Sequence, residues 1–130
     1  MDIGHYVEPI TNKLFKKETG KKTKMNKDSF FKRHHGATPD AFVINEHGEE
    51  TDLVEFKYST KGAKWASLPD FVFCQVQWQL HVMSRERCDV AALIAWRGTS
   101  FKTFEVYRDE NFIDNVVKLV NEFWSAIKSG

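Results

Sequence analysis

Two carboxylates and a lysine, Asp40, Glu55 and Lys57, have the residue types and spacing that best suit a chemical reaction in this chain. Asp40 follows a proline, and a single residue separates Glu55 from Lys57. Paired carboxylates bind a hard divalent cation through oxygen, and a lysine beside them can orient a water molecule or stabilise the charge that develops on a phosphodiester. The pattern therefore predicts a metal site that acts on a phosphate ester.

The elements around these residues must bring them together. Side chains two residues apart on a strand share a face, so Glu55 and Lys57 are expected to point the same way. The sequence NEHGEE between Asp40 and Glu55 is typical of a hairpin turn, and two antiparallel strands would bring the carboxylates together. Pro-Asp is also a common turn dipeptide and Glu-x-Lys a common pattern of exposed strands, so the motif alone also fits a surface without chemistry.

Hydrophobic periodicity predicts an α/β fold. We expect helices over residues 4–19, 69–84 and 111–128, and strands over residues 23–33, 41–44, 53–57, 89–96 and 101–107. This order predicts one domain, residues 1–130, with a central mixed β-sheet flanked by helices. The last helix is amphipathic and is expected to close the domain.

The helix over residues 69–84 is expected both to pack on the sheet and to contribute to the site. Its packing stripe is predicted to consist of Phe71, Cys74, Trp78 and Val82. Gln75 and Gln79 lie one turn apart and are expected to face the site. The preceding loop, residues 59–68, is expected to lie over the site, with Trp65 either stacking on a base or anchoring the loop to the core.

Composition indicates a folded intracellular protein. Apolar residues make up 42% of the chain, no apolar run is long enough to span a bilayer, and the first residues lack the features of a signal peptide. We therefore expect a cytoplasmic protein without a membrane association. Cys74 and Cys88 are expected to be buried thiols rather than a disulfide. His34 and His35 are expected to point to opposite faces of a strand, which disfavours a zinc site.

Positive charge is concentrated near the start of the chain, although the net charge is only +1. Residues 1–33 contain nine lysines and arginines against four acidic residues. A basic segment beside an acidic metal site suits a protein that binds a phosphodiester backbone, although a solvated helix end and a lysine-rich loop would give the same pattern. The side chains expected to contact DNA through this segment and the loop over the site are Lys22, Lys24, Lys32, Arg33, Lys61 and Lys64.

Four blocks of sequence, taken in order, resemble a known family. They are Gly4-His5-Tyr6-Val7-Glu8, Thr38-Pro39-Asp40, Glu55-Phe56-Lys57 and Gln75-Val76-Gln77. Together they resemble the lambda-exonuclease or YqaJ-like viral recombinase nucleases, a branch of the PD-(D/E)XK superfamily. The resemblance covers nearly the whole chain and implies a restriction-endonuclease-like core.

The resemblance also implies roles for individual residues. Asp40 and Glu55 would bind the metal, with the backbone carbonyl of Phe56 completing the shell, and Lys57 would be the catalytic lysine. Glu8 would act through a water molecule or a second cation, although an acidic residue near a helix start is also stabilised by the helix dipole. Gln75 would contact the DNA backbone or orient the site, and Gln77 is a weaker candidate for the same role. The two glutamines would otherwise be polar positions beside a buried stripe.

The function implied by the resemblance is a Mg²⁺- or Mn²⁺-dependent deoxyribonuclease, favoured as a phage-type exonuclease that processes DNA ends in recombination. It would work in the cytoplasm of a bacterial host, on DNA, with a single-strand annealing protein as a candidate partner and a homo-oligomer as a candidate assembly. Longer members of the family carry further residues ahead of the Gly4 block, so processive digestion by a ring of three subunits is not carried over. The alternatives are a structure-specific or nicking endonuclease of the same fold and a DNA-binding module without catalysis.

Overall fold

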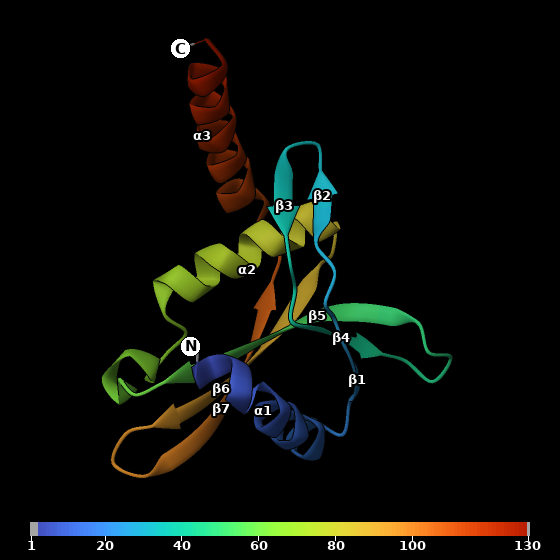
Figure 1. Ribbon diagram of the computed structural model, residues 1–130, viewed down its shortest axis with the longest axis vertical. Coiled ribbons are helices and arrows are strands. Elements are labelled where there is room, and N and C mark those ends of the chain that lie inside the picture. Colours follow the sequence, from blue (N-terminus) through green and yellow to red (C-terminus); the bar gives the residue numbers. More distant parts are fainter. Residues whose placement is uncertain (1–2, 130) are drawn as a thin grey trace.

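A computed structural model describes residues 3–129, without the side chains of residues 3–5 and of residues 63 and 64. Figure 1 shows three helices arranged around a central sheet, with a small separate hairpin beside it. The elements in chain order are α1 (Ile3–Thr19), β1 (Lys22–Met25), β2 (Phe30–Lys32), β3 (His35–Ala37), β4 (Ala41–Ile44), β5 (Glu50–Ser59), the short 3-10 helix η1 (Gly62–Trp65), α2 (Asp70–Met83), β6 (Arg87–Ala95), β7 (Thr99–Tyr107) and α3 (Glu110–Ser129).

The central sheet has the strand order β1-β4-β5-β6-β7. β5 and β6 are parallel and are joined through α2, whereas the other neighbouring pairs are antiparallel. A parallel pair needs such a crossover because its strands start at the same edge of the sheet. The predicted hairpin is present as β4 and β5, and the expected mixed sheet flanked by helices is confirmed.

Side chains on the two opposite faces of the sheet pack against two different helices. On one face Val54 and Phe56 of β5 pack with Phe15 of α1. On the other face Leu53 packs with α2, through Val72, Val76 and Leu80. The face that carries Leu53 therefore also carries Glu55 and Lys57, because residues two apart on a strand point to the same side. Glu55 and Lys57 thus lie between the sheet and α2.

The segment expected to be one polar strand over residues 23–33 forms two short strands instead. β1 pairs with β4 at the edge of the central sheet, whereas β2 pairs with β3 in a separate hairpin. The chain leaves the sheet after Met25, and Arg33 has a left-handed backbone (φ 58°) that turns the hairpin. A short polar strand carries too weak a periodicity to reveal such a break.

The predicted packing stripe of α2 is correct at Val82, which is buried, and wrong at Phe71 and Cys74. Phe71 and Cys74 are exposed, so the expectation of a buried thiol holds for Cys88 and fails for Cys74. The buried residues of the helix are Val72, Val76, Gln77, Gln79, Leu80 and Val82. One reason is that α2 is covered on two sides: the sheet lies against one, and the β2–β3 hairpin packs on another, where the Trp78 indole donates to the Gly36 carbonyl at 2.9 Å.

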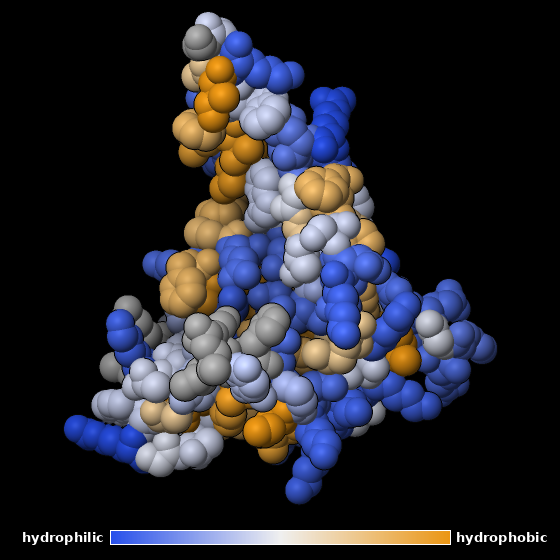
Figure 2. All heavy atoms as spheres, in the orientation of Figure 1, coloured by the Kyte–Doolittle hydropathy of each residue, from blue (hydrophilic) through white to orange (hydrophobic). Residues whose placement is uncertain are grey.

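Helix α3 does not close the domain as expected. It extends away from the sheet, next to the β2–β3 hairpin (Figure 1), and Ile113 is its one buried residue among those described. Leu119 and Phe123 are 65% and 67% exposed, and Figure 2 shows apolar side chains along this helix. The amphipathic pattern predicted the helix correctly, but it did not predict what the apolar side would contact.

Histidines link α3 to the rest of the fold, and their predicted arrangement is wrong. The imidazoles of His34 and His35 lie with ring centroids 4.3 Å apart, and Nε2 of each is within 3.1 Å of the Asn121 Oδ1 atom of α3. Strand alternation does not apply because His34 belongs to the turn. His35 Nδ1 also lies 3.0 Å from His81 Nε2, so this polar cluster holds the hairpin between α2 and α3. Among the side chains that the structure describes, no three histidine, cysteine or acidic residues are arranged to hold a metal.

The loop between β5 and α2 is anchored by Trp65. Of the two roles expected of this residue, the structure shows the anchor, because the indole is buried and packs near Phe104. Lys102 Nζ donates to the backbone carbonyl of Trp65 at 2.7 Å.

No helix in the described part of the chain is both long and apolar enough to cross a membrane.

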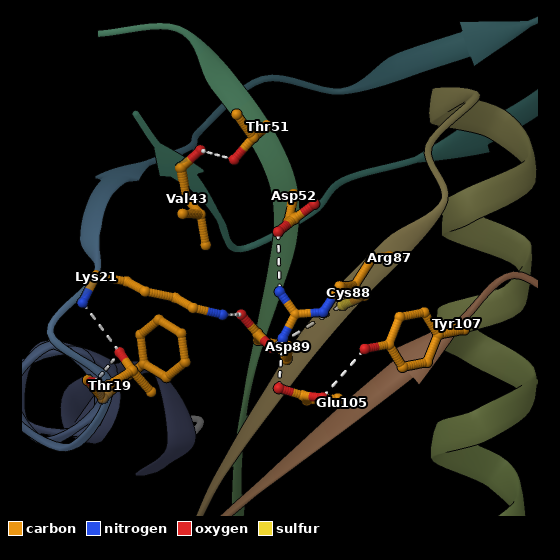
Figure 3. A network of polar contacts seen from close by, with 11 residues as sticks. Thr19, Lys21, Val43, Thr51, Asp52, Arg87, Cys88, Asp89, Glu105 and Tyr107 are labelled. Carbon is orange, nitrogen blue, oxygen red and sulfur yellow. Dashed lines mark hydrogen bonds and ion pairs between the residues drawn. The ribbon is translucent and has the colours of Figure 1, made fainter. Parts of the chain in front are cut away.

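A network of charges fastens the sheet at the end of β5 remote from Lys57 (Figure 3). Arg87 pairs with Asp89 at 2.8 Å, with Asp52 at 3.0 Å and with Glu105 at 2.8 Å, and thereby links β5, β6 and β7. Lys21, just after α1, reaches the buried Asp89 at 2.8 Å. The carboxylate of Asp89 is therefore shielded from water and compensated by two cations.

We expect Arg87→Met to lower the free energy of unfolding by about 3 kcal/mol, because it removes one cation from the buried Asp89 carboxylate. Lys21 still pairs with Asp89 in this variant, so the expected loss of stability lies near the lower end of the range for broken buried ion pairs. Glu105→Gln is the matched control: Glu105 is largely exposed, so its pair contributes less than about 1 kcal/mol. Urea unfolding measures both variants, and equal losses would contradict this account of Asp89.

Candidate metal centre

Asp40 is placed by the point at which β4 begins. The β4–β5 ladder starts with Ala41 opposite Val54, so β4 does not extend far enough to pair with Phe56. The Asp40 carboxylate replaces the missing strand partner: its Oδ2 accepts the Phe56 N–H at 2.8 Å. One carboxylate of the predicted pair is thus held by the backbone of the strand that carries the other.

The same geometry places the Phe56 carbonyl toward Asp40. In an extended strand the N–H and C=O of one residue point to the same side. Because the Phe56 N–H points to Asp40, the carbonyl of this residue also lies on that side of β5. This orientation agrees with the ligand role that the resemblance implied for this carbonyl, which remains a prediction.

Glu55, Lys57 and Gln75 form a connected polar group between β5 and α2. Lys57 Nζ donates to Gln75 Oε1 at 2.6 Å and lies 3.4 Å from Glu55 Oε2. Gln75 Nε2 in turn donates to Glu55 Oε2 at 3.2 Å. The amide of Gln75 therefore orients both charged groups, while the other carboxylate oxygen, Oε1 of Glu55, has no hydrogen-bond partner among the described residues.

Burial dominates the electrostatics of Glu55, which is only 2% exposed. Desolvation, followed by repulsion from the neighbouring Asp40, raises the pKa of Glu55 to about 8, against smaller opposing effects of Lys57 and a Gln79 hydrogen bond. When protonated, Glu55 donates a hydrogen bond to Asp40, which also favours the neutral form. Two carboxylates this close, one of them buried, strongly favour binding of a proton or a cation.

Glu8 and Asp40 line one cleft of about 350 Å³. α1 contributes Glu8 to this cleft, and the segment before β4 contributes Asp40. The remaining lining residues are Met25, Asn26, Lys27, Thr38 and Pro39. The structure therefore brings together the predicted carboxylates of the first and second sequence blocks, with a lysine in the same cleft.

Comparison with known proteins agrees with this architecture. The family described as the YqaJ-like viral recombinase domain matches residues 1–86. The chain belongs to this family. No curated protein sequence gives a significant match.

Solved structures share the fold. The alkaline exonuclease LHK-Exo of Laribacter hongkongensis has a TM-score of 0.81 at 20% identity, over 97% of this chain and 67% of that chain. Its complex with dAMP has a TM-score of 0.77 at the same identity and coverage. A phage-related exonuclease of Haemophilus somnus 129PT has a TM-score of 0.71 at 13% identity, over 97% of this chain and 70% of that one. Identities this low show the fold alone.

In this YqaJ-like chain, Asn26 is a residue of the site that the sequence did not reveal. Its Nδ2 donates to the Pro39 carbonyl at 2.7 Å, and its backbone N–H donates to the Asp40 carbonyl at 3.0 Å. Asn26 thus fixes the backbone from which the Asp40 carboxylate projects. Asparagine in a polar segment between two short strands gives no signal that would distinguish it from an ordinary turn residue.

Gln77 was predicted to contact DNA, and this prediction is wrong. The side chain is 0% exposed. Its Nε2 donates to the Tyr107 carbonyl at 2.8 Å, and its Oε1 accepts the Asp109 N–H at 2.9 Å. Two residues along a helix correspond to more than half a turn, so Gln77 faces away from Gln75 and fastens the turn between β7 and α3.

We expect Gln77→Met to lower the free energy of unfolding by about 1–3 kcal/mol, because it removes both hydrogen bonds by which the buried Gln77 amide holds the Tyr107 carbonyl and the Asp109 N–H. Urea unfolding measures the loss, and a filter-binding titration measures DNA affinity. Affinity for DNA per folded molecule should stay at the wild-type value. A stable variant that no longer bound DNA would restore the original interpretation.

The basic residues predicted to contact DNA divide into two groups. Lys61 lies just beyond the end of β5, and Lys22 is exposed on β1. The side chain of Lys64 lies outside the described residues. Lys24 instead pairs with Glu50 at 3.2 Å.

Lys32 and Arg33 lie at the turn of the β2–β3 hairpin. Lys32 Nζ donates to the His81 carbonyl at 3.1 Å and lies 2.7 Å from Ser84 Oγ, at the C-terminal end of α2. This lysine therefore fastens the hairpin to α2, and its ammonium group is engaged there instead of being available to DNA.

Proposed function

We propose that this chain is a divalent-metal-dependent deoxyribonuclease. The observation that carries the proposal is the buried Glu55, whose carboxylate adjoins Asp40 and Lys57 and whose Oε1 atom has no partner in the described part of the chain. Burial of an incompletely paired carboxylate costs several kcal/mol, so a stable fold contains such a site only if something compensates the charge. A bound divalent cation would supply that compensation.

The donor set fits Mg²⁺ or Mn²⁺. Asp40 and Glu55 supply carboxylate oxygens, and Phe56 supplies a carbonyl on the Asp40 side of β5. Hard cations of this kind use few protein oxygens and keep several water molecules. Glu8 would act through one of these waters, since it lines the same cleft. When bound, the cation makes water a stronger nucleophile at neutral pH and stabilises negative charge on the phosphate.

The residues of the chain then perform the remaining tasks. Lys57, held by Gln75 and close to Glu55, would place a positive charge beside the phosphodiester and orient the attacking water. Gln75 keeps the Lys57 ammonium and the Glu55 carboxylate in a fixed relation. Lys61, beyond the end of β5, and Lys22 would neutralise neighbouring phosphates.

DNA ends are the substrate we favour. Three of the solved structures that share the fold are of proteins described as exonucleases, and one of these structures contains dAMP. Membership of the viral recombinase family supports a role in phage-type recombination in a bacterial cell, where a single-strand annealing protein and further copies of the chain are candidate partners.

Digestion of three substrates with Mg²⁺, Mn²⁺ or EDTA tests the proposal. The substrates are a linear duplex with a 5′ phosphate, the same duplex without it, and a closed circular plasmid. We expect metal-dependent digestion of the linear DNA and no digestion in EDTA. Nicking of the circle would identify an endonuclease of the same fold, and binding without cleavage of any substrate would identify a DNA-binding module.

A further inference from the structure

We propose that Gln79 is a positioning residue of the metal centre: its N–H group orients Glu55 while its carbonyl oxygen accepts a hydrogen bond from a water molecule bound to the cation. This inference rests on the proposed function. Gln79 lies outside the four sequence blocks.

The first observation is the position of Gln79. It lies four residues after Gln75 on α2, so both side chains project from the same side of the helix, toward the face of β5 that carries Glu55. Its amide acts on Glu55 as a hydrogen-bond donor, an effect that lowers the pKa of that carboxyl. Gln75 and Gln79 thus approach one carboxylate from two successive turns of the helix.

The second observation is an unsatisfied acceptor. Gln79 is 5% exposed, and its Oε1 has no hydrogen-bond partner among the described residues. A buried amide carbonyl without a partner costs about 1–3 kcal/mol. Since Oε1 and Nε2 share one carbon, an amide whose nitrogen serves Glu55 places its oxygen close to the same carboxylate.

Two unpartnered acceptors therefore occur at one place, Oε1 of Gln79 and Oε1 of Glu55. When Glu55 is ionised, as it must be to bind a cation, these two acceptors cannot satisfy each other, so a donor or a cation is required between or beside them. A cation on the carboxylate, with a water molecule that donates to the amide, satisfies both. Residues that support metal ligands in this way typically change metal affinity 10- to 100-fold when mutated.

Gln79→Met tests the proposal, since methionine has a similar length but neither donates nor accepts strong hydrogen bonds. Calorimetric titration of the variant with Mn²⁺ should give a dissociation constant at least about 10-fold above that of the wild type. The melting temperature in EDTA should change little, because the substitution removes a buried acceptor without a partner together with one hydrogen bond to Glu55. A purely structural role predicts the reverse: a lower melting temperature in EDTA and unchanged Mn²⁺ affinity.

Two further variants complete the experiment. Gln77→Met changes the same residue type on the same helix away from the site, and should lower the melting temperature without changing Mn²⁺ affinity. Gln79→Glu keeps an acceptor at the same reach, so it should restore Mn²⁺ binding to the wild-type value or tighter. Mn²⁺ binding by Gln79→Glu as weak as that of Gln79→Met would overturn the role of the carbonyl oxygen.

Failure of this inference differs from failure of the proposed function. If the wild type binds Mn²⁺ and cleaves DNA, and Gln79→Met binds Mn²⁺ equally well, the inference about Gln79 is wrong while the nuclease stands. If the wild type neither binds Mn²⁺ nor cleaves DNA, the proposed function is wrong and the inference is lost with it.

Discussion

Asp40→Asn is expected to reduce metal-dependent DNA cleavage by at least about a thousand-fold, which corresponds to about 4 kcal/mol of transition-state stabilisation. Asparagine retains an oxygen that can accept the Phe56 N–H, so the start of β4 should keep its structure. The substitution removes the negative charge that would bind the cation beside Glu55. Initial rates on a linear 5′-phosphorylated duplex in Mn²⁺ measure the effect.

The control for this variant is Asp114→Asn, the same chemical change at an exposed position of α3. It should cleave DNA at the wild-type rate. The melting temperature in EDTA should be at or above the wild-type value for Asp40→Asn, because repulsion of Glu55 is removed. Wild-type cleavage by a folded Asp40→Asn protein would rule out Asp40 as a metal ligand.

The second large effect is a fall in the stability of the metal-free protein as the pH rises. The folded-state pKa of Glu55 is raised to about 8, above its ordinary value of 4.5, so the native state binds more protons than the unfolded chain between these values. The free energy of unfolding should therefore decrease by about 1.4 kcal/mol for each pH unit within this window. Urea unfolding in EDTA at pH values from 5 to 9 measures the slope.

Glu55→Gln should flatten this dependence, since an amide does not titrate. His81 has the opposite sign, because burial lowers the pKa of this imidazole and stability then rises with pH up to its ordinary pKa of 6.5. The contribution of Glu55 is therefore seen most clearly from pH 6.5 to 8. A wild-type slope equal to that of Glu55→Gln in this window would show that Glu55 is ionised in the metal-free protein.

Most of the site was predictable because strand geometry is simple. Alternation alone puts Glu55 and Lys57 on one face, and the turn residues between Asp40 and Glu55 predict the hairpin. Helical periodicity also placed Gln75 and Gln79 on the side of the site, because positions four apart share a side of a helix; positions two apart do not, which is why the prediction for Gln77 failed. Asn26 was not predictable, because its role depends on where Pro39 and Asp40 lie in space.

The errors in the fold arise where tertiary contacts decide. Two apolar stripes compete on α2: one contains Phe71 and Cys74, and the other contains Val72, Val76 and Leu80. Both satisfy helical periodicity, and the sequence does not say which stripe meets the sheet. For α3, the pattern predicts an apolar face but not its partner, and the structure leaves that face exposed.

The most direct test of the metal centre is an anomalous difference map from crystals of the wild-type protein soaked in Mn²⁺. We predict a peak within about 2.0–2.2 Å of carboxylate oxygens of both Asp40 and Glu55, the distance range for a small hard cation, and no such peak in Asp40→Asn. A fully occupied ion elsewhere, with Asp40 and Glu55 bound to each other through a shared proton, would contradict the assignment.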